Sequence, residues 1–156
     1  MNSKKIFFSA WRPSWANEIV INILRIATGM VMLSSHGWPK YMNYTVLFIA
    51  FPDPLGIGST LSLMLTIFAE VFCSLLLIFG LFTRLAIIPL IITMIVAISL
   101  IHSGDAFQQK ELAFVYLFIY VMLLFTGPGK FSLDRYFSNK NKSLQDTEHP
   151  NNGIWK

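Results

Sequence analysis

The sequence has few charged residues. Of its 156 residues, 13% are charged and 54% are apolar, whereas a soluble domain usually carries about a quarter charged residues. A water-soluble core of this length does not hide that much apolar surface, so the composition predicts a membrane protein. The formal net charge of +4 does not indicate a nucleic-acid partner, because the charges lie almost entirely at the ends of apolar segments.

The sequence also has a single cysteine, Cys73. An internal disulfide, a CxxC redox pair and a cysteine metal cage are therefore excluded, and Cys73 is interpreted as a packing residue within an apolar run. A phosphate-binding loop is lacking too, because the segment from Thr126 to Lys130 does not have the GxxxxGK[ST] spacing. No small-residue cleavage pattern follows Lys4 and Lys5, so the first apolar stretch is predicted to be an uncleaved helix.

Four apolar runs remain, and they predict an all-α fold: an integral membrane four-helix bundle. Residues 19–37 and 57–82 are long enough to cross a bilayer at 1.5 Å per residue. Residues 85–101 and 112–126 are near the short end of the spanning range, so we expect their flanks to complete the crossing. The segment from Met42 to Phe51 is too short to span, and we expect it to lie along the outer interface or dip back into the bundle.

The positions of the basic residues predict the orientation of the bundle. With four crossings, nine of the twelve lysine and arginine residues fall on one side, Lys40 and Lys110 fall on the other, and Arg25 lies within the first span. Basic residues are enriched on the cytoplasmic side of membrane proteins. Both termini are therefore predicted to be inside, an N-in/C-in topology.

No Pro/Gly/Ser-rich linker divides the apolar part of the chain, so one transmembrane domain is expected over residues 19–137. A cytoplasmic segment over residues 1–18 precedes it. From residue 138 to residue 156 no apolar period remains, which predicts a flexible cytoplasmic tail.

Two charged residues, Arg25 and Glu70, stand inside apolar spans. A charge there costs at least about 2.5–3.5 kcal/mol on insertion scales, so both side chains should face the bundle interior. Thr66 and Ser74 extend a polar stripe on either side of Glu70, and Gly29 lets another backbone approach near Arg25. We predict a direct or water-bridged pair of Arg25 and Glu70. Such a pair either fixes the helix register or relays protons, and the sequence leaves both readings open.

A second polar cluster is predicted at the outer ends of the helices, formed by His36, Lys40, His102 and Glu111. Interfacial histidine beside glutamate suits a quinone head group, which needs a hydrogen-bond partner for each carbonyl oxygen and a proton route. Plain polar capping of helix ends is the alternative. A haem is not expected, because its histidine ligands would lie deeper in the spans. No metal site is expected either, because two histidines and one acid at unspecific spacing are common by chance.

The order and spacing of several short motifs resemble the DoxX family of small bacterial and archaeal membrane proteins. These motifs cover roughly residues 18 to 136 and are, in chain order, Leu24 to Gly29, His36 to Lys40, Glu70, Gly80 to Arg84, Glu111 and Gly127 to Asp134. The resemblance implies a four-helix membrane bundle. It also implies that the following are family-pattern positions: Arg25, His36, Gly37, Lys40, Glu70, Arg84, Glu111 and Asp134. The chain departs from the family at residues 108–111, which read Gln-Gln-Lys-Glu where Asn-Gly is frequent before the glutamate.

Relatives in this family include the membrane subunits of thiosulfate:quinone oxidoreductase, so the resemblance implies a role beside membrane redox enzymes. We therefore expect a multi-pass subunit of the bacterial inner membrane that is accessory to a redox partner protein and offers a quinone or quinol site. No covalently bound cofactor is expected. The alternatives are a small-molecule or lipid transporter that uses the cavity of Arg25 and Glu70, and a structural assembly subunit without chemistry of its own. A homo- or hetero-oligomer fits each reading.

Overall fold

The computed structural model describes residues 14–148, and the side chains of residues 15–140. Four of its helices are long and apolar enough to cross a membrane: Trp15–Met42, Ser59–Phe79, Thr83–Ile101 and Phe107–Thr126. The predicted all-α membrane bundle is thereby confirmed. The third and fourth spans begin at Thr83 and Phe107, before residues 85 and 112, so flanking residues lengthen these two helices as expected.

Three of the four spans contain a π-helical segment, which interrupts the first two and ends the third. The first span consists of α2 (Ser14–Met32), η1 (Leu33–Gly37) and α3 (Trp38–Met42). The second consists of α5 (Ser59–Ile67), η2 (Phe68–Cys73) and α6 (Ser74–Phe79). The third consists of α7 (Thr83–Val96) and η3 (Ala97–Ile101), and the fourth is α8 (Phe107–Thr126). Single π-helical turns within α-helices are frequent at functional sites.

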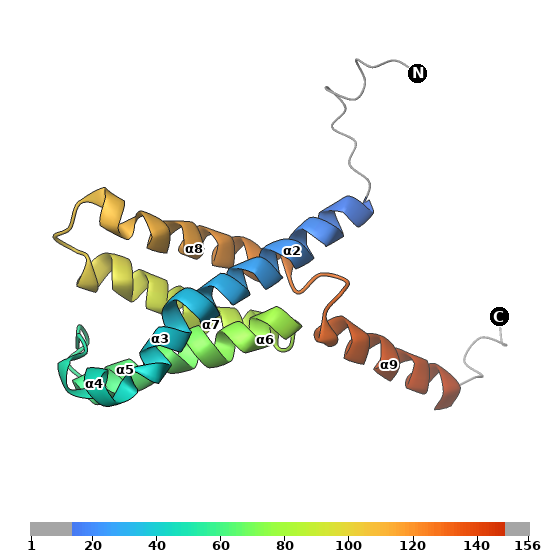
Figure 1. Cartoon of the computed structure of the whole chain (residues 1–156). Helices are drawn as coiled ribbons and strands as arrows, with labels where there is room; N and C mark the ends of the chain where they lie inside the picture. Colours follow the sequence, from blue (N-terminus) through green and yellow to red (C-terminus); the bar gives the residue numbers. More distant parts are fainter. Residues whose placement is uncertain (1–13, 149–156) are drawn as a thin grey trace, which may run out of the picture.

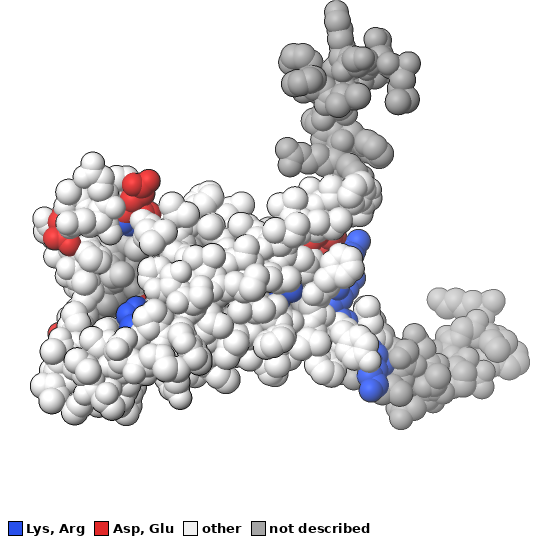
Figure 2. All heavy atoms as spheres, viewed as in Figure 1, with Lys and Arg blue, Asp and Glu red and all other residues white. Residues whose placement is uncertain are grey.

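Each of the four spans packs against the spans next to it in the chain, and the fourth packs back against the first. The first span contacts the second through α6 and the fourth through α8, and α7 packs between the second span and α8. The start of α2 and the C-terminal helix therefore lie at the same end of the bundle (Figure 1). We call this the inner end, after the predicted orientation, and the opposite end the outer end. Figure 2 shows charged side chains gathered at the two ends, with an uncharged surface between them.

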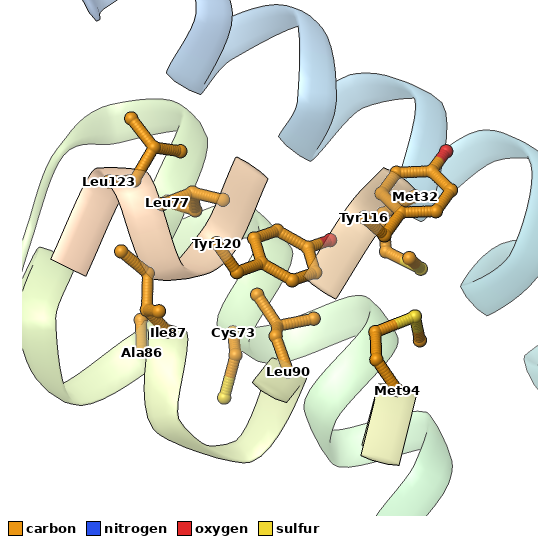
Figure 3. Packing of buried hydrophobic residues seen from close by; sticks show 10 residues of the cluster. All are labelled: Met32, Cys73, Leu77, Ala86, Ile87, Leu90, Met94, Tyr116, Tyr120 and Leu123. Atoms are coloured by element: carbon orange, nitrogen blue, oxygen red, sulfur yellow. The ribbon is translucent and has the colours of Figure 1, made fainter. Parts of the chain in front are cut away.

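The apolar core lies where α6, α7 and α8 meet. Leu77, Leu90 and Tyr120 are completely buried there, and Figure 3 shows them in one cluster, with Tyr120 in its middle. Gly29 brings α2 against α6, since a Cβ at this glycine would lie 3.2 Å from the carbonyl oxygen of Ser74. The close backbone approach expected at Gly29 is therefore present.

The segment after the first span forms a short helix, α4 (Tyr44–Ala50). It packs against α3 and α5 at the outer end of the bundle, and the Thr60 hydroxyl donates a hydrogen bond of 3.2 Å to the carbonyl oxygen of Phe48. The sequence predicts that this segment lies along the outer interface or dips back into the bundle. The structure places it beside the outer half of the second span.

The C-terminal helix, α9 (Leu133–Glu148), extends away from the bundle at the inner end (Figure 1). Where the sequence predicted a frayed tail from residue 138, the structure continues the helix through Glu148. Lysine and glutamine, which occur in this segment, favour a helix by their intrinsic propensity. The flexibility of the tail stays a prediction, and residues 149–156 lie outside the described part, as do residues 1–13 of the predicted N-terminal segment.

Arg25 holds the inner end of the bundle together. Its side chain is 1% exposed, and Nη1 donates to the carbonyl oxygens of Leu77 at 2.5 Å and Ile78 at 3.0 Å. Both carbonyls belong to the last turn of α6, where the regular helical donors run out, and the Leu77 oxygen also accepts a hydrogen bond of 3.1 Å from the Gly80 N–H. Nη2 donates to the carbonyl oxygen of Phe131 at 3.2 Å, so one guanidinium joins α2, the end of α6 and the loop before α9.

Asp134 completes this arrangement from the start of α9. Its carboxylate accepts hydrogen bonds from the backbone N–H groups of Phe82 at 2.8 Å and Thr83 at 3.0 Å, which are free donors at the start of α7. Phe82 has a left-handed conformation with φ of 47°. Since non-glycine residues rarely adopt that conformation, the carboxylate also stabilises an unfavourable turn.

We expect Asp134→Ala to lower the free energy of unfolding by about 1 kcal/mol, the usual loss when a helix N-cap is removed. The measurement is denaturant unfolding of the purified protein in detergent micelles. Glu111→Ala, which removes an exposed acid at the outer end, is the matched control. Equal stability of the two variants would contradict the capping role of Asp134.

Candidate functional site

Glu70 lies on η2 and is 3% exposed. Its Oε2 atom pairs with Nζ of Lys40, from α3, at 2.5 Å. The Lys40 side chain is 26% exposed, so the ion pair joins a buried carboxylate to a cation that partly reaches the surface. An opposite charge is what an acid within a membrane span needs.

Gly37 explains why these two residues meet. A Cβ at this position would lie 2.6 Å from the carbonyl oxygen of Glu70, so the backbones of η1 and η2 touch where Gly37 stands. Lys40 follows Gly37 by three residues, about one helical turn. The close contact of the two π-helical segments therefore sets the depth at which Lys40 reaches Glu70.

The predicted direct or water-bridged pair of Arg25 and Glu70 is wrong, because each side chain has other partners. Arg25 contacts the carbonyl oxygens of Leu77 and Ile78, which are seven and eight residues beyond Glu70, or about 10–12 Å along a helix. The long second span is anchored at its inner end, so Arg25 lies level with the last turn of α6. Both charged side chains do face the bundle interior as predicted, but the cavity that Glu70 lines does not include Arg25 among its lining residues.

Lys40 and Glu70 line a cavity of about 520 Å³ at the outer end of the bundle. One wall comes from the second span and another from the third, and the loop before α5 closes the outer side. Figure 2 shows the outer end hollowed between the lobe of α4 and α5 and the lobe of η3 and α8. Most of the lining is apolar, and it includes Phe51, Pro52, Pro54, Leu55, Ile57, Leu65, Phe68, Ala69, Pro89, Ile92, Val96, Ala97 and Ile101.

His102 also lines this cavity. It follows η3, and its Nδ1 atom lies 2.7 Å from Oδ2 of Asp105. Ser62, Thr66 and Thr93 add hydroxyl groups to the lining, but the Thr66 and Thr93 hydroxyls donate to the carbonyls four residues earlier in their own helices. Lys40, Glu70 and His102 are therefore the charged or titratable side chains that the structure brings to this cavity.

The other two predicted outer residues lie elsewhere. His36 is half-buried and meets the edge of the Tyr116 ring, with the ring centroids 5.7 Å apart. Glu111 is exposed near the start of α8. Neither residue belongs to the cavity lining, so the predicted cluster of four is divided between the cavity, the neighbouring face of the bundle and the surface.

Two tyrosines behind Glu70 were not predicted. Tyr116 and Tyr120 stack on α8 with ring centroids 5.9 Å apart, and both are buried in the core of the bundle. The buried hydroxyls of Tyr120 and Ser74 have no hydrogen-bond partner among the described residues. The spacing of four residues between the tyrosines was the available signal, since it places both on one helix face.

A family model described as DoxX matches residues 20–103, more than half of the chain. The chain belongs to the DoxX family. An uncharacterized membrane protein of Mycobacterium tuberculosis (strain ATCC 25618 / H37Rv) is 32% identical to it over an alignment of 158 positions. The alignment covers 82% of this chain and 91% of that protein. No solved structure matches the chain.

The DoxX match covers most of the first span and all of the second and third, and with them the charged or titratable residues of the cavity, Lys40, Glu70 and His102. The resemblance seen in the sequence extends further, to residue 136, and includes Asp134 of the inner end. In the described part of the chain, no group of three or more His, Cys, Asp or Glu side chains is placed to hold a metal ion.

Asp53 fastens the loop that closes the DoxX cavity. Its carboxylate accepts hydrogen bonds from the backbone N–H groups of Gly58 at 2.7 Å and Ile57 at 3.0 Å, and from the Ser62 hydroxyl at 2.8 Å. Hydrogen bonds to the charged form stabilise it, and those from Gly58 and Ser62 contribute most to lowering the pKa of Asp53 below its ordinary value of 3.8.

A pKa that is lower in the folded than in the unfolded protein contributes stability above the unfolded value, and this contribution is lost as the pH falls through the folded value. We therefore expect Asp53→Asn to be less stable than the wild type at pH 7, with the difference shrinking below about pH 4. Thermal unfolding in detergent across this pH range is the measurement. A difference that does not change with pH would rule out the carboxylate charge as its cause.

We expect Gly37→Ala to destabilise the protein by about 1–3 kcal/mol, the usual cost of overpacking, although alanine favours a helix more than glycine does. The added methyl group would push η1 away from the Glu70 backbone. The matched control is Gly104→Ala, because a Cβ there meets nothing within 4 Å. Unfolding in detergent compares the two, and equal stability would show that the backbones can separate freely at Gly37.

Proposed function

We propose that this DoxX protein is a membrane subunit accessory to a redox complex of the bacterial inner membrane, and that its outer cavity binds the head group of a quinone or quinol. The observation that carries the proposal is the ion pair of Lys40 and Glu70 in the wall of a mainly apolar cavity. Sites for small organic ligands typically combine an apolar lining with a few placed polar groups, in volumes of about 300–1,000 Å³.

The ion pair provides both kinds of hydrogen bond that a quinone and a quinol require. An ammonium group only donates hydrogen bonds and an ionised carboxylate only accepts them. Lys40 therefore suits a quinone carbonyl oxygen, and Glu70 suits a quinol hydroxyl. Hydrogen bonds to charged groups are about twice as strong as neutral ones, and they are strengthened further by the low dielectric of a protein interior.

Part of the cavity wall consists of exposed apolar residues of the second and third spans. Leu65, Phe68 and Ile92 line the cavity, and these residues are 47–53% exposed. Exposed apolar surface within a membrane span can contact lipid or the apolar part of a ligand. This position supports a ligand with an apolar tail, which remains in the bilayer while the head group occupies the cavity.

In this function, a partner protein supplies electrons to the quinone or accepts them from the quinol. The sequence carries a single cysteine and no dinucleotide-binding fingerprint, so its own residues offer the quinone hydrogen bonds and proton exchange. The relatives that the sequence resembles include membrane subunits of a quinone-dependent oxidoreductase, which supports the same assignment by analogy.

We expect Lys40→Met to weaken the binding of a short-tailed benzoquinone at least tenfold, because a hydrogen bond to a charged group contributes about 1.5–3 kcal/mol. Equilibrium binding to the purified protein in lipid nanodiscs is the measurement. Lys110→Met is the matched control, since Lys110 lies at the same outer end but does not line the cavity.

Lys40→Met also leaves Glu70 without its cation, which could lower binding by disturbing the fold. A second variant therefore blocks the cavity while the ion pair stays intact. Ala97→Phe places a ring in the cavity from the opposite wall and should reduce binding at least as strongly. Wild-type affinity in both variants, or no binding by the wild type, would exclude the proposed site. Uptake of a solute into liposomes without quinone binding would instead favour a transporter.

A further inference from the structure

The mouth of the cavity carries a second acid–base pair. His102 lines the cavity at its outer end, where the chain turns from η3 toward α8. Its Nδ1 atom lies 2.7 Å from the Asp105 carboxylate, and the two side chains are 36% and 43% exposed. The Lys40 and Glu70 side chains, which line the same cavity, are 26% and 4% exposed, so the cavity has one mainly buried acid–base pair and one more exposed pair.

The contact with Asp105 decides which nitrogen of His102 carries the proton. An ionised carboxylate accepts hydrogen bonds and cannot donate them, so Nδ1 of a neutral His102 must be the protonated nitrogen. The hydrogen bond at one ring nitrogen sets the state of the other, which leaves Nε2 as an acceptor. A carboxylate that orients a histidine in this way is the arrangement used in general-base catalysis.

The charged groups around His102 come from its own turn and from across the cavity. Lys110 donates to the carbonyl oxygen of Ser103 at 3.3 Å and so lies over the same turn. Lys40 and Glu70 face the cavity from the first and second spans. Asp105 is the acid that touches the imidazole.

We propose that Asp105 orients His102 so that Nε2 accepts a hydroxyl proton from a quinol in the cavity and releases it to the outer water. This inference rests on the proposed quinone site and adds the direction of proton exchange. In the step, the quinol O–H bond breaks and an N–H bond forms at Nε2, giving a quinol monoanion and an imidazolium. The imidazolium then gives the proton to water. His102 acts as the base, and Asp105 is a positioning residue.

The proposal predicts that the site distinguishes quinol from quinone. A quinol hydroxyl can donate to Nε2, whereas a quinone carbonyl oxygen cannot. We expect Asp105→Ala and His102→Ala each to weaken quinol binding about fivefold, the effect of one neutral hydrogen bond, and to leave quinone binding nearly unchanged. The double variant should resemble either single variant, because both changes remove the same interaction.

The test measures the ratio of quinol to quinone affinity for the full-length protein in nanodiscs, with a short-tailed benzoquinone and its reduced form under anaerobic conditions. Glu111→Ala is the matched control, since it removes an exposed acid from the same end outside the cavity lining.

Nitrogen-15 NMR of labelled histidine adds a readout that needs no ligand. The wild type should show His102 protonated at Nδ1, and Asp105→Ala should lose that preference.

The possible results show separately whether the role of His102 and Asp105 fails and whether the proposed quinone site fails. A lower affinity ratio in Asp105→Ala, with the control unchanged and the tautomer altered, supports the inference. An unchanged ratio in a protein that does bind quinone overturns the role of Asp105 and His102 but leaves the proposed function in place. If neither quinone nor quinol binds the wild type, both proposals fail together.

Discussion

A carboxylate within a membrane-spanning helix requires a cation, and the ion pair of Glu70 with Lys40 meets that requirement. The pair forms because Gly37 lets the backbones of η1 and η2 touch. That contact sets the depth of the first span against the second, and it places Lys40 and Glu70 in the cavity wall. The outer half of the bundle therefore depends on one glycine contact and the ion pair beside it.

The inner end solves a similar problem in another way. Arg25 is as deeply buried as Glu70, but its guanidinium is satisfied mainly by backbone carbonyl oxygens at the end of α6 and in the loop before α9. Its planar group has five donors, so it joins several segments at once, and Asp134 adds a cap on α7. The inner end is thus closed by many short contacts, whereas the outer end keeps a cavity.

The four spans could be predicted from the sequence, because the length and apolar character of a spanning helix are properties of one continuous segment. It also predicted correctly that Arg25 and Glu70 face the interior. It did not predict their partners, because the depth of one span against another depends on a backbone contact at Gly37. The π-helical segments have no local signature, and they displace the residues that follow them around the helix. Asp105 was missed although it stands three residues after His102, since that spacing is common in turns.

Stability alone does not explain the ion pair in the cavity wall. Replacing a buried ion pair by well-packed apolar residues is often neutral or stabilising, and apolar residues would also suit the lining around Lys40 and Glu70. A charged pair in such a place contributes what an apolar pair cannot, namely a fixed donor and a fixed acceptor for a ligand. The same reasoning applies to the exposed pair of His102 and Asp105, because exposed ion pairs contribute little to folding. Both pairs line or adjoin one cavity, and their chemistry is more specific than their contribution to stability.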